Sequence, residues 1–159
     1  MIINTPNLNE ARKQIQKQRK EIEASKNLGS LGKEVIVRAQ DVEFNRKILE
    51  IKEVDILLSP ELHNRKDKLK ERDSGLNEIL CRIAAKNNIK IGIDIEEIKK
   101  AEGKERAIIL ARLMQNIMLC KKTRAEIKIL NCKEKDKREA FSLLLTLGAS
   151  TEQAKKAIE

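Results

Sequence analysis

Residues 54–67 read VDILLSPELHNRKD, and this stretch decides how the rest of the chain is interpreted. The apolar run from Val54 to Leu58 ends at Ser59-Pro60, because proline has no amide proton for a strand to use and keeps the residue before it out of the helical region. The run is therefore predicted to be a buried strand over 54–59. The polar, mostly cationic segment after it lies past the carboxyl end of that strand, where α/β folds build their sites.

Strand and helix patterns alternate on both sides of this stretch. Besides 54–59, short apolar segments predict strands at 1–3, 35–37, 89–93 and 127–130. Because crossovers between parallel strands are right-handed, we expect a parallel sheet with the helices outside it. A closed barrel of the usual kind has eight strands, so about five supply only part of one. The predicted fold class is α/β, with parallel strands alternating with helices in an incomplete barrel.

Capping residues and apolar spacing predict the helices. Side chains that can cap a helix stand at Asp41, at Asp73 or Ser74, and at Asp94, Asp136 and Ser150. One helix face is predicted from the spacing of Leu76, Ile79, Leu80, Ile83 and Ala84. Between Lys104 and about Lys122 apolar residues are so frequent that a long, broadly buried helix is expected.

Length and composition indicate one intracellular domain. The 159 residues fit a single domain over 1–159, in which the segment near 27–33, with its glycines and serine, is predicted to be a flexible linker. Three cysteines are too few for a disulfide framework, which favours a reducing compartment. The longest apolar run, Leu143 to Leu145, is far too short to cross a membrane, so a cytoplasmic location is expected.

The charge of the chain points to nucleic acid as a partner. Thirty-four Lys and Arg residues against twenty-five Asp and Glu give a net charge of +9, and such a surface attracts phosphate polyanions. Two phenylalanines, with no tyrosine or tryptophan, leave almost nothing on which to stack bases. Contact through phosphates and RNA shape is therefore favoured over a stacking platform. An ordinary basic enzyme is the alternative explanation of the charge.

Cationic residues follow several of the predicted strands. Because the carboxyl ends of parallel strands meet at one edge of a sheet, the loops after the second to fifth strands are expected to lie together. Their cations would line a phosphate-binding surface: Arg38, Arg65, Lys66, Lys68, Lys70, Lys133, Lys135, Lys137 and Arg138. Acidic residues in the same loops, such as Glu61 and Asp136, leave open the alternative of an ordinary solvated surface.

Catalysis by the chain itself has little support in its residues. His63 is the only histidine, so a multi-histidine metal centre cannot be built and a general base would lack an orienting partner. Asp55, Asp67 and Asp94 are the carboxylates that a magnesium site would use, although a place at a strand start, an ion pair and a helix cap explain them more simply. Cys81 and Cys120 fall among apolar residues and are interpreted as packed small hydrophobes.

Several short motifs resemble one protein family. They are VDILLSP at 54–60, NRKD at 64–67, GLN at 75–77, GKERA at 103–107, RE at 138–139 with LG at 147–148, and QAKKA at 153–157. Over roughly residues 35–159 the chain resembles protein component 3 of archaeal ribonuclease P, the thirty-kilodalton subunit class. The loop from Asn64 to Asp67 is the most specific part of the resemblance.

The resemblance implies a TIM-barrel-like protein that assists a catalytic RNA in removing the 5′ leader of precursor tRNA. Its partners would be the ribonuclease P RNA, the precursor tRNA, a small ferredoxin-like protein subunit and other ribonuclease P proteins. The chain would be non-catalytic and hold no cofactor or metal of its own, with Mg²⁺ at the active site of the RNA. The RNA-facing residues would be Arg38, Asn64, Arg65, Lys66, Lys68 and Arg138.

Two other functions stay open at this point. One is a stand-alone metal-dependent phosphoesterase or nuclease that uses Asp55, Asp67 and Asp94. The other is a scaffold that binds only protein partners.

The chain also departs from the family pattern: about two strand–helix units are missing before Val35, Lys68 to Asp73 are extra, Glu78 replaces a usual histidine, and the loop after Leu130 is short.

Overall fold

The computed structural model describes residues 2–26, 34–67 and 72–159, and these residues contain one five-stranded sheet. Its strands are β1 (Ile2–Ile3), β2 (Ile36–Arg38), β3 (Ile56–Leu58), β4 (Lys90–Asp94) and β5 (Ile127–Leu130). Every neighbouring pair is parallel and the strands lie in chain order, with β1 and β5 at the two open edges. The predicted α/β class, with an incomplete barrel of five parallel strands, is confirmed.

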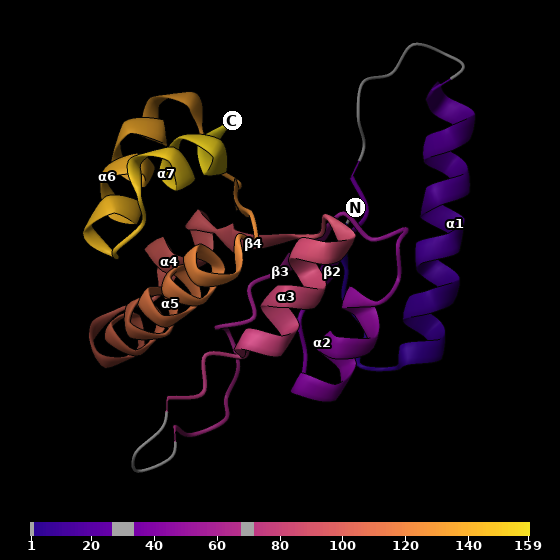
Figure 1. The fold of residues 1–159 in the computed structure, drawn as a ribbon, viewed down its shortest axis with the longest axis horizontal. Helices are drawn as coiled ribbons and strands as arrows, with labels where there is room; N and C mark the ends of the chain where they lie inside the picture. The colour runs from indigo at the N-terminus through magenta and orange to yellow at the C-terminus, as the bar shows by residue number, and fades with distance from the viewer. Residues whose placement is uncertain (1, 27–33, 68–71) are drawn as a thin grey trace.

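Helices follow the strands and cover one face of the sheet. They are α1 (Leu8–Lys26), α2 (Val42–Leu49), α3 (Glu78–Asn87), α4 (Ile95–Lys100), α5 (Gly103–Thr123), the 3₁₀ turn η1 (Glu134–Asp136), α6 (Lys137–Thr146) and α7 (Thr151–Ile158). In Figure 1, α1 stands at one end of the molecule, α5, α6 and α7 stand at the other, and α2 and α3 lie between them. No helix of the described residues is long and apolar enough to cross a bilayer.

The two faces of the sheet carry different side chains. One row in register across the sheet, Ile3, Val37, Leu57, Ile91 and Ile127, belongs to the hydrophobic core beneath the helices. The next row points to the opposite, inner face and consists of Arg38, Leu58, Gly92 and Lys128. Burial of the first row against the helices contributes to the apolar driving force for this layer packing.

Gly92 leaves room on the inner face for its neighbours. A Cβ atom at Gly92 would lie 2.7 Å from Cγ2 of Ile56 and 3.2 Å from Cδ1 of Leu58. On either side of this gap the two basic residues of the row form ion pairs. Arg38 lies 2.8 Å from Glu97, and Lys128 lies 2.9 Å from Glu34. The inner face is therefore apolar at its centre and closed by ion pairs toward β2 and β5.

Three predicted helix caps are present in the structure. Asp41 Oδ1 accepts from the amide of Phe44 at 2.8 Å, and Ser150 Oγ accepts from the amide of Gln153 at 3.2 Å. Asp94 Oδ1 accepts from the amides of Glu96 and Glu97. The predicted linker near 27–33 lies outside the described residues.

Two predicted caps were wrong. Helix α3 begins later than expected and is capped by Asn77, whose Oδ1 accepts from the amide of Leu80 at 2.9 Å. Neither Asp73 nor Ser74 caps it, because the chain between them and the helix still turns against the corner at Pro60. Asp136 makes no cap hydrogen bond and instead pairs with Lys99 at 2.7 Å.

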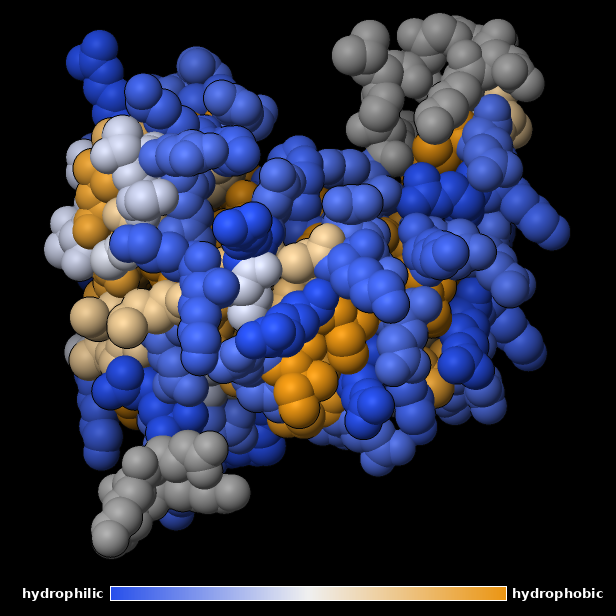
Figure 2. Space-filling model, viewed as in Figure 1, coloured by the Kyte–Doolittle hydropathy of each residue, from blue (hydrophilic) through white to orange (hydrophobic). Residues whose placement is uncertain are grey.

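Two apolar patterns in the sequence predicted more buried side chains than the structure has. Ile79 was predicted to face the core but is 64% exposed, because α3 buries Leu80, Cys81 and Ala84 instead. Helix α5 was predicted to be broadly buried, yet Met114 and Met118 are both exposed. Figure 2 shows apolar areas on the left, over α5 and α6, and another near the centre, by the start of α3, in a face that is elsewhere largely hydrophilic. Cys81 and Cys120 are fully buried, as predicted.

Candidate nucleic-acid interface

The loop after β3 begins and ends at a tight turn beside Pro60. Ser59 takes a left-handed conformation with φ of 50°, and its amide donates to the carbonyl of Gly92 at 2.9 Å. The chain returns to this turn at Gly75, which has φ of 78° and where a Cβ atom would overlap the carbonyl oxygen of Pro60. Only glycine fits this close approach without strain. The segment between Pro60 and Gly75 therefore leaves and re-enters the fold at one point.

Arg112 of α5 holds the first half of this loop in shape. Its side chain is 6% exposed, and its guanidinium donates to the carbonyls of Glu61 at 3.1 Å, His63 at 3.0 Å and Arg65 at 2.7 Å. It also lies 2.9 Å from the carboxylate of Asp67. A guanidinium can serve four such acceptors because its five N–H donors are spread in a rigid plane. Arg112 therefore positions the loop from beneath.

Sequence reasoning missed Arg112, although a signal was present. The buried stripe of α5 includes Ile109, Leu113 and Ile117, and Arg112 and Asn116 lie on the same stripe. A charged and an amide side chain at helix positions that face the core need partners, because buried polar groups are nearly always hydrogen-bonded. Asn116 indeed donates to the carbonyl of Ser74 at 3.1 Å, so both residues fasten the same loop.

The second half of the loop is held by Asp73. Arg65 Nε donates to Asp73 Oδ2 at 2.7 Å and Nη2 donates to Oδ1 at 3.3 Å, so the pair is bidentate. This hydrogen bonding is the largest cause of the lowered pKa of Asp73, which falls to about 2. The guanidinium of Arg65 is therefore partly committed to the protein, although its side chain remains 36% exposed.

His63 is part of the same network. Burial, followed by the neighbouring charges of Arg112 and Arg65, lowers the pKa of His63, which keeps the ring neutral near pH 7. In the neutral ring that fits both contacts, Nε2–H donates to the carbonyl of Asp73 at 2.9 Å and Nδ1 accepts from the amide of Arg65 at 3.2 Å. Both nitrogens are used, so His63 supports the loop rather than serving as a base.

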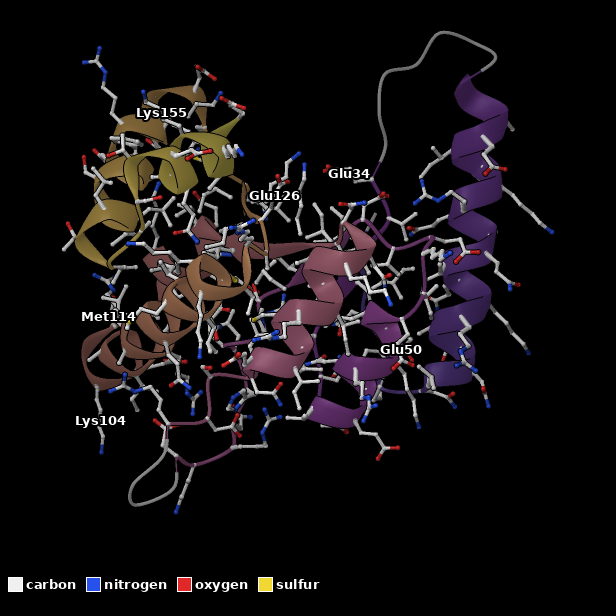
Figure 3. The ribbon with its side chains drawn as sticks, in the orientation of Figure 1. Glu34, Glu50, Lys104, Met114, Glu126 and Lys155 are labelled. Atoms are coloured by element: carbon white, nitrogen blue, oxygen red, sulfur yellow. The ribbon has the colours of Figure 1, made fainter. Side chains whose placement is uncertain are left out.

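A cavity of about 760 Å³ lies between this loop and the helices α4 and α5. Its lining from the loop runs from Glu61 to Asp67, and its lining from the helices consists of Glu97, Lys100, Ala101, Lys104, Glu105, Ile108, Ile109 and Arg112. Lys66, Lys100 and Lys104 are exposed and make no ion pair with any residue that the structure describes. We call these three residues the lysine rim. In Figure 3, Lys104 extends from the start of α5 on the side of the loop after β3.

The structure places the predicted site residues in three groups. Asn64, Arg65 and Lys66 line the cavity together. Arg38 lies on the inner face of the sheet and is paired with Glu97, which lines the cavity. Arg138 is exposed near the start of α6 and does not line the cavity, and Lys68 lies outside the described residues. Whether these residues bind RNA stays a prediction.

The second cationic loop is fastened beside α4. Asn131 Nδ2 donates to Asp94 Oδ2 at 2.6 Å, and Lys99 of α4 lies 2.7 Å from Asp136 of η1. Lys133, Lys135 and Arg138 are exposed on this loop and the helix start after it. Sequence reasoning missed Lys100 and Lys104, because it assigned the surface to loops alone, whereas these two lysines end α4 and begin α5.

The three aspartates of the alternative metal site are not brought together. Asp55 precedes β3 at the amino end of the sheet and pairs with Arg19 at 3.0 Å, whereas Asp94 caps α4 at the carboxyl end. Asp67 is held by Arg112. Among the described residues no group of three or more acidic, histidine or cysteine side chains is arranged to hold a metal ion. The simpler interpretation of the three aspartates, in which Asp55 stands at a strand start, Asp67 forms an ion pair and Asp94 caps a helix, is therefore confirmed.

Comparison with known proteins gives consistent matches. The chain is 32% identical over 120 residues to ribonuclease P protein component 3 of Methanococcus maripaludis strain C6, a match that spans 76% of this chain and 44% of that protein. The component 3 protein of Methanosarcina acetivorans is 28% identical over 131 residues, or 78% of this chain and 51% of that protein. No family model matches the chain.

A solved structure has the same fold. A chain in the cryo-EM structure of archaeal ribonuclease P with mature tRNA superposes with a TM-score of 0.73 and 23% identity, covering 98% of this chain and 62% of that one. The chain spans about half the length of the curated relatives it matches. These matches confirm the resemblance drawn from the motifs: over about three quarters of its length, the chain is similar to ribonuclease P protein component 3.

Proposed function

We propose that the chain is a protein subunit of a ribonuclease P, in which it assists the catalytic RNA in removing the 5′ leader of precursor tRNA. The observation that supports this proposal is the lysine rim. Three exposed lysines stand around a cavity at the carboxyl end of a parallel sheet without a described ion-pair partner. Unpaired cations attract phosphates because they release counterions from the nucleic acid on binding.

The remaining geometry supports a role in binding rather than in chemistry. Both ring nitrogens of His63 form hydrogen bonds within the loop, and the aspartates of the alternative metal site lie apart. Residues 61–67 are held by Arg112 and Asp73, so their backbone would present Asn64 and Lys66 to RNA in one shape. A preformed binding surface loses little conformational entropy when the RNA docks. The ribonuclease P RNA and precursor tRNA are the proposed partners, with Mg²⁺ held by the RNA.

The test is a reconstituted ribonuclease P that contains this chain. A triple variant, Lys66→Glu, Lys100→Glu and Lys104→Glu, should lower cleavage of precursor tRNA and reduce the salt dependence of RNA binding by about two to three in the log–log slope. The matched control reverses Lys13, Lys17 and Lys20, which are exposed on α1 and carry the same total charge change. The control should retain most of the activity and the slope.

Two outcomes would contradict the proposal. Equal losses in the two triple variants would mean that only total charge matters and that the lysine rim is not a binding surface. Cleavage of precursor tRNA by the purified chain with Mg²⁺ and without the RNA subunit would show that the chain carries out the chemistry itself.

A further inference from the structure

Glu61 is a buried acid to which no other described residue provides a hydrogen-bond partner. The residue is 1% exposed, and neither carboxyl oxygen is hydrogen-bonded to another described residue. Native proteins rarely leave such a group unpaired, because a buried polar atom without a partner destabilises the fold. Glu61 also lines the cavity beside the lysine rim. A ligand in this cavity would therefore lie next to the unpaired acid.

The charge state of Glu61 decides what kind of ligand fits. Burial is the largest cause of its raised pKa, which reaches about 8, and the like charges of Glu97 and Asp94 raise it further, against the opposite effects of the backbone amide of Glu61 itself and of Arg38. Near pH 7 the carboxyl group is therefore neutral and carries one O–H donor. A neutral acid can donate to an oxygen or nitrogen acceptor and does not repel a phosphate.

The rest of the cavity has an apolar side and a cationic side. Leu62, Ala101 and Ile108 contribute aliphatic surface, and Ile108 is 36% exposed although it is a large hydrophobic residue. The lysine rim contributes the cations. The volume of about 760 Å³ lies within the range of roughly 300–1,000 Å³ that small-molecule sites occupy. The aliphatic side chains suit the base or sugar of a nucleotide, and the lysine rim suits its phosphate. The buried donor suits an acceptor atom on the same nucleotide.

From this arrangement we infer that the cavity binds a single unstacked nucleotide of a single-stranded RNA segment. The lysine rim contacts its phosphates, Ile108 and Leu62 contact the base or ribose, and Glu61 donates a hydrogen bond to an acceptor on the same nucleotide. Proteins that read single-stranded RNA commonly splay out single bases and hydrogen-bond to their edges. In this cavity aliphatic side chains would contact the base in place of the usual aromatic ones. The inference rests on the proposed function for the identity of the ligand as RNA, and it adds the form in which that RNA is bound.

Binding can be measured with the full chain and a short single-stranded RNA that contains one 2-aminopurine. Unstacking of this base raises its fluorescence, so saturation with protein should increase the signal. Ile108→Ser should weaken binding by about tenfold, whereas Met114→Ser, an exposed residue of the same helix that does not line the cavity, should leave it unchanged. A duplex RNA of equal charge should compete poorly.

The role of Glu61 has its own pair of variants. Glu61→Gln keeps a neutral donor and should bind like the wild type, whereas Glu61→Leu removes the donor and should bind about tenfold more weakly. Binding by the wild type should weaken as pH rises from 7 to 9, while binding by Glu61→Gln should not. Of the other groups near this site, Glu97, Asp94 and Arg38 are present in both proteins, and His63 is neutral across this range because its pKa is lowered.

The outcomes separate this inference from the proposed function. Unchanged fluorescence, equal competition by duplex RNA or by inorganic phosphate, or equal effects of Ile108→Ser and Met114→Ser would each overturn the nucleotide pocket. If Glu61→Leu fails to fold, Ile108→Ser still decides the matter. Loss of reconstituted activity in the lysine-rim variant alone would leave the ribonuclease P role standing without the pocket. If the chain binds the nucleotide but the lysine-rim variant leaves reconstituted cleavage unchanged, the result would support the pocket and contradict the ribonuclease P role.

Discussion

The guanidinium of Arg38 lies 2.8 Å from the carboxylate of Glu97, although the two residues belong to β2 and to α4, two strands further along the sheet. Both side chains are more than two-thirds buried, and Ser59 Oγ lies 3.4 Å from the same carboxylate. Arg38 was predicted to face RNA, and that stays a prediction. The ion pair links the carboxyl end of β2 to the helix that follows β4.

Removal of either partner of this pair should lower stability more than RNA affinity. Arg38→Ala and Glu97→Ala are each expected to cost about 1–3 kcal/mol of unfolding free energy, because each leaves a largely buried charge without its partner. Urea unfolding of both variants and of the double variant measures this. The double variant should lose less than the sum of the single losses, and strictly additive losses would show that the two groups do not interact.

Arg112 should be irreplaceable by lysine. Arg112→Lys keeps the charge but cannot donate to the carbonyls of Glu61, His63 and Arg65 at once, so a loss of about 2–4 kcal/mol is expected. Amide hydrogen exchange should speed up between residues 61 and 67. Arg82→Lys is the control, because Arg82 forms an exposed pair with Glu78 and should change stability by less than about 0.5 kcal/mol. Equal effects of the two substitutions would mean that the loop does not depend on Arg112.

The corner at Pro60 should make Gly75 sensitive to a single methyl group. Gly75→Ala adds backbone strain of about 1–2 kcal/mol at positive φ and, in addition, an overlap with Pro60 that costs about 1–3 kcal/mol more. Gly148→Ala is the matched control, since Gly148 has φ of 100° but nothing within 4 Å of the added atom. The difference between the two thermal unfolding free energies isolates the overlap. A Gly148 variant as unstable as the Gly75 variant would show that strain alone accounts for the loss.

Glu61 should make the stability of the protein depend on pH. Its folded pKa of about 8 lies above the ordinary value of 4.5, so the folded state holds one more proton between these pH values. The stabilisation linked to that proton is complete below about pH 4.5 and is lost as pH rises through about 8. Relative to Glu61→Gln, the wild type should lose up to about 1.4 kcal/mol per pH unit in this window, as measured by urea unfolding from pH 5 to 9. Parallel curves would mean that Glu61 is ionised in the folded protein.

Local signals in the sequence predicted much of the fold. Proline after an apolar run, as at Ser59-Pro60, ends a strand whatever surrounds it, and side chains such as Asp41 and Ser150 cap the helices that follow them. These features depend on neighbours in the sequence. The parallel strand order followed from the alternation of strands and helices, which allows few other topologies.

The candidate site was harder to predict because its contacts are distant in sequence. Arg112 reaches the carbonyl of Glu61 across 51 positions of the chain, and no pattern in either segment names the other. Asp73 has a side chain that suits a helix cap, but the bidentate contact with Arg65 competes for it and Asn77 takes the cap. Charge alone could not separate Arg38, which is paired, from Lys66, which has no described ion-pair partner.

The brevity of β1 has a consequence for how the protein behaves at high concentration. An open parallel sheet presents unpaired backbone groups at its borders, and such borders invite edge-to-edge polymerisation into fibrils. Here one border strand has only two residues, Ile2 and Ile3, and the other, β5, carries Lys128. A short border and a buried-face lysine both discourage the addition of a foreign strand. Both features oppose edge-to-edge addition at the borders of the sheet formed by the described residues.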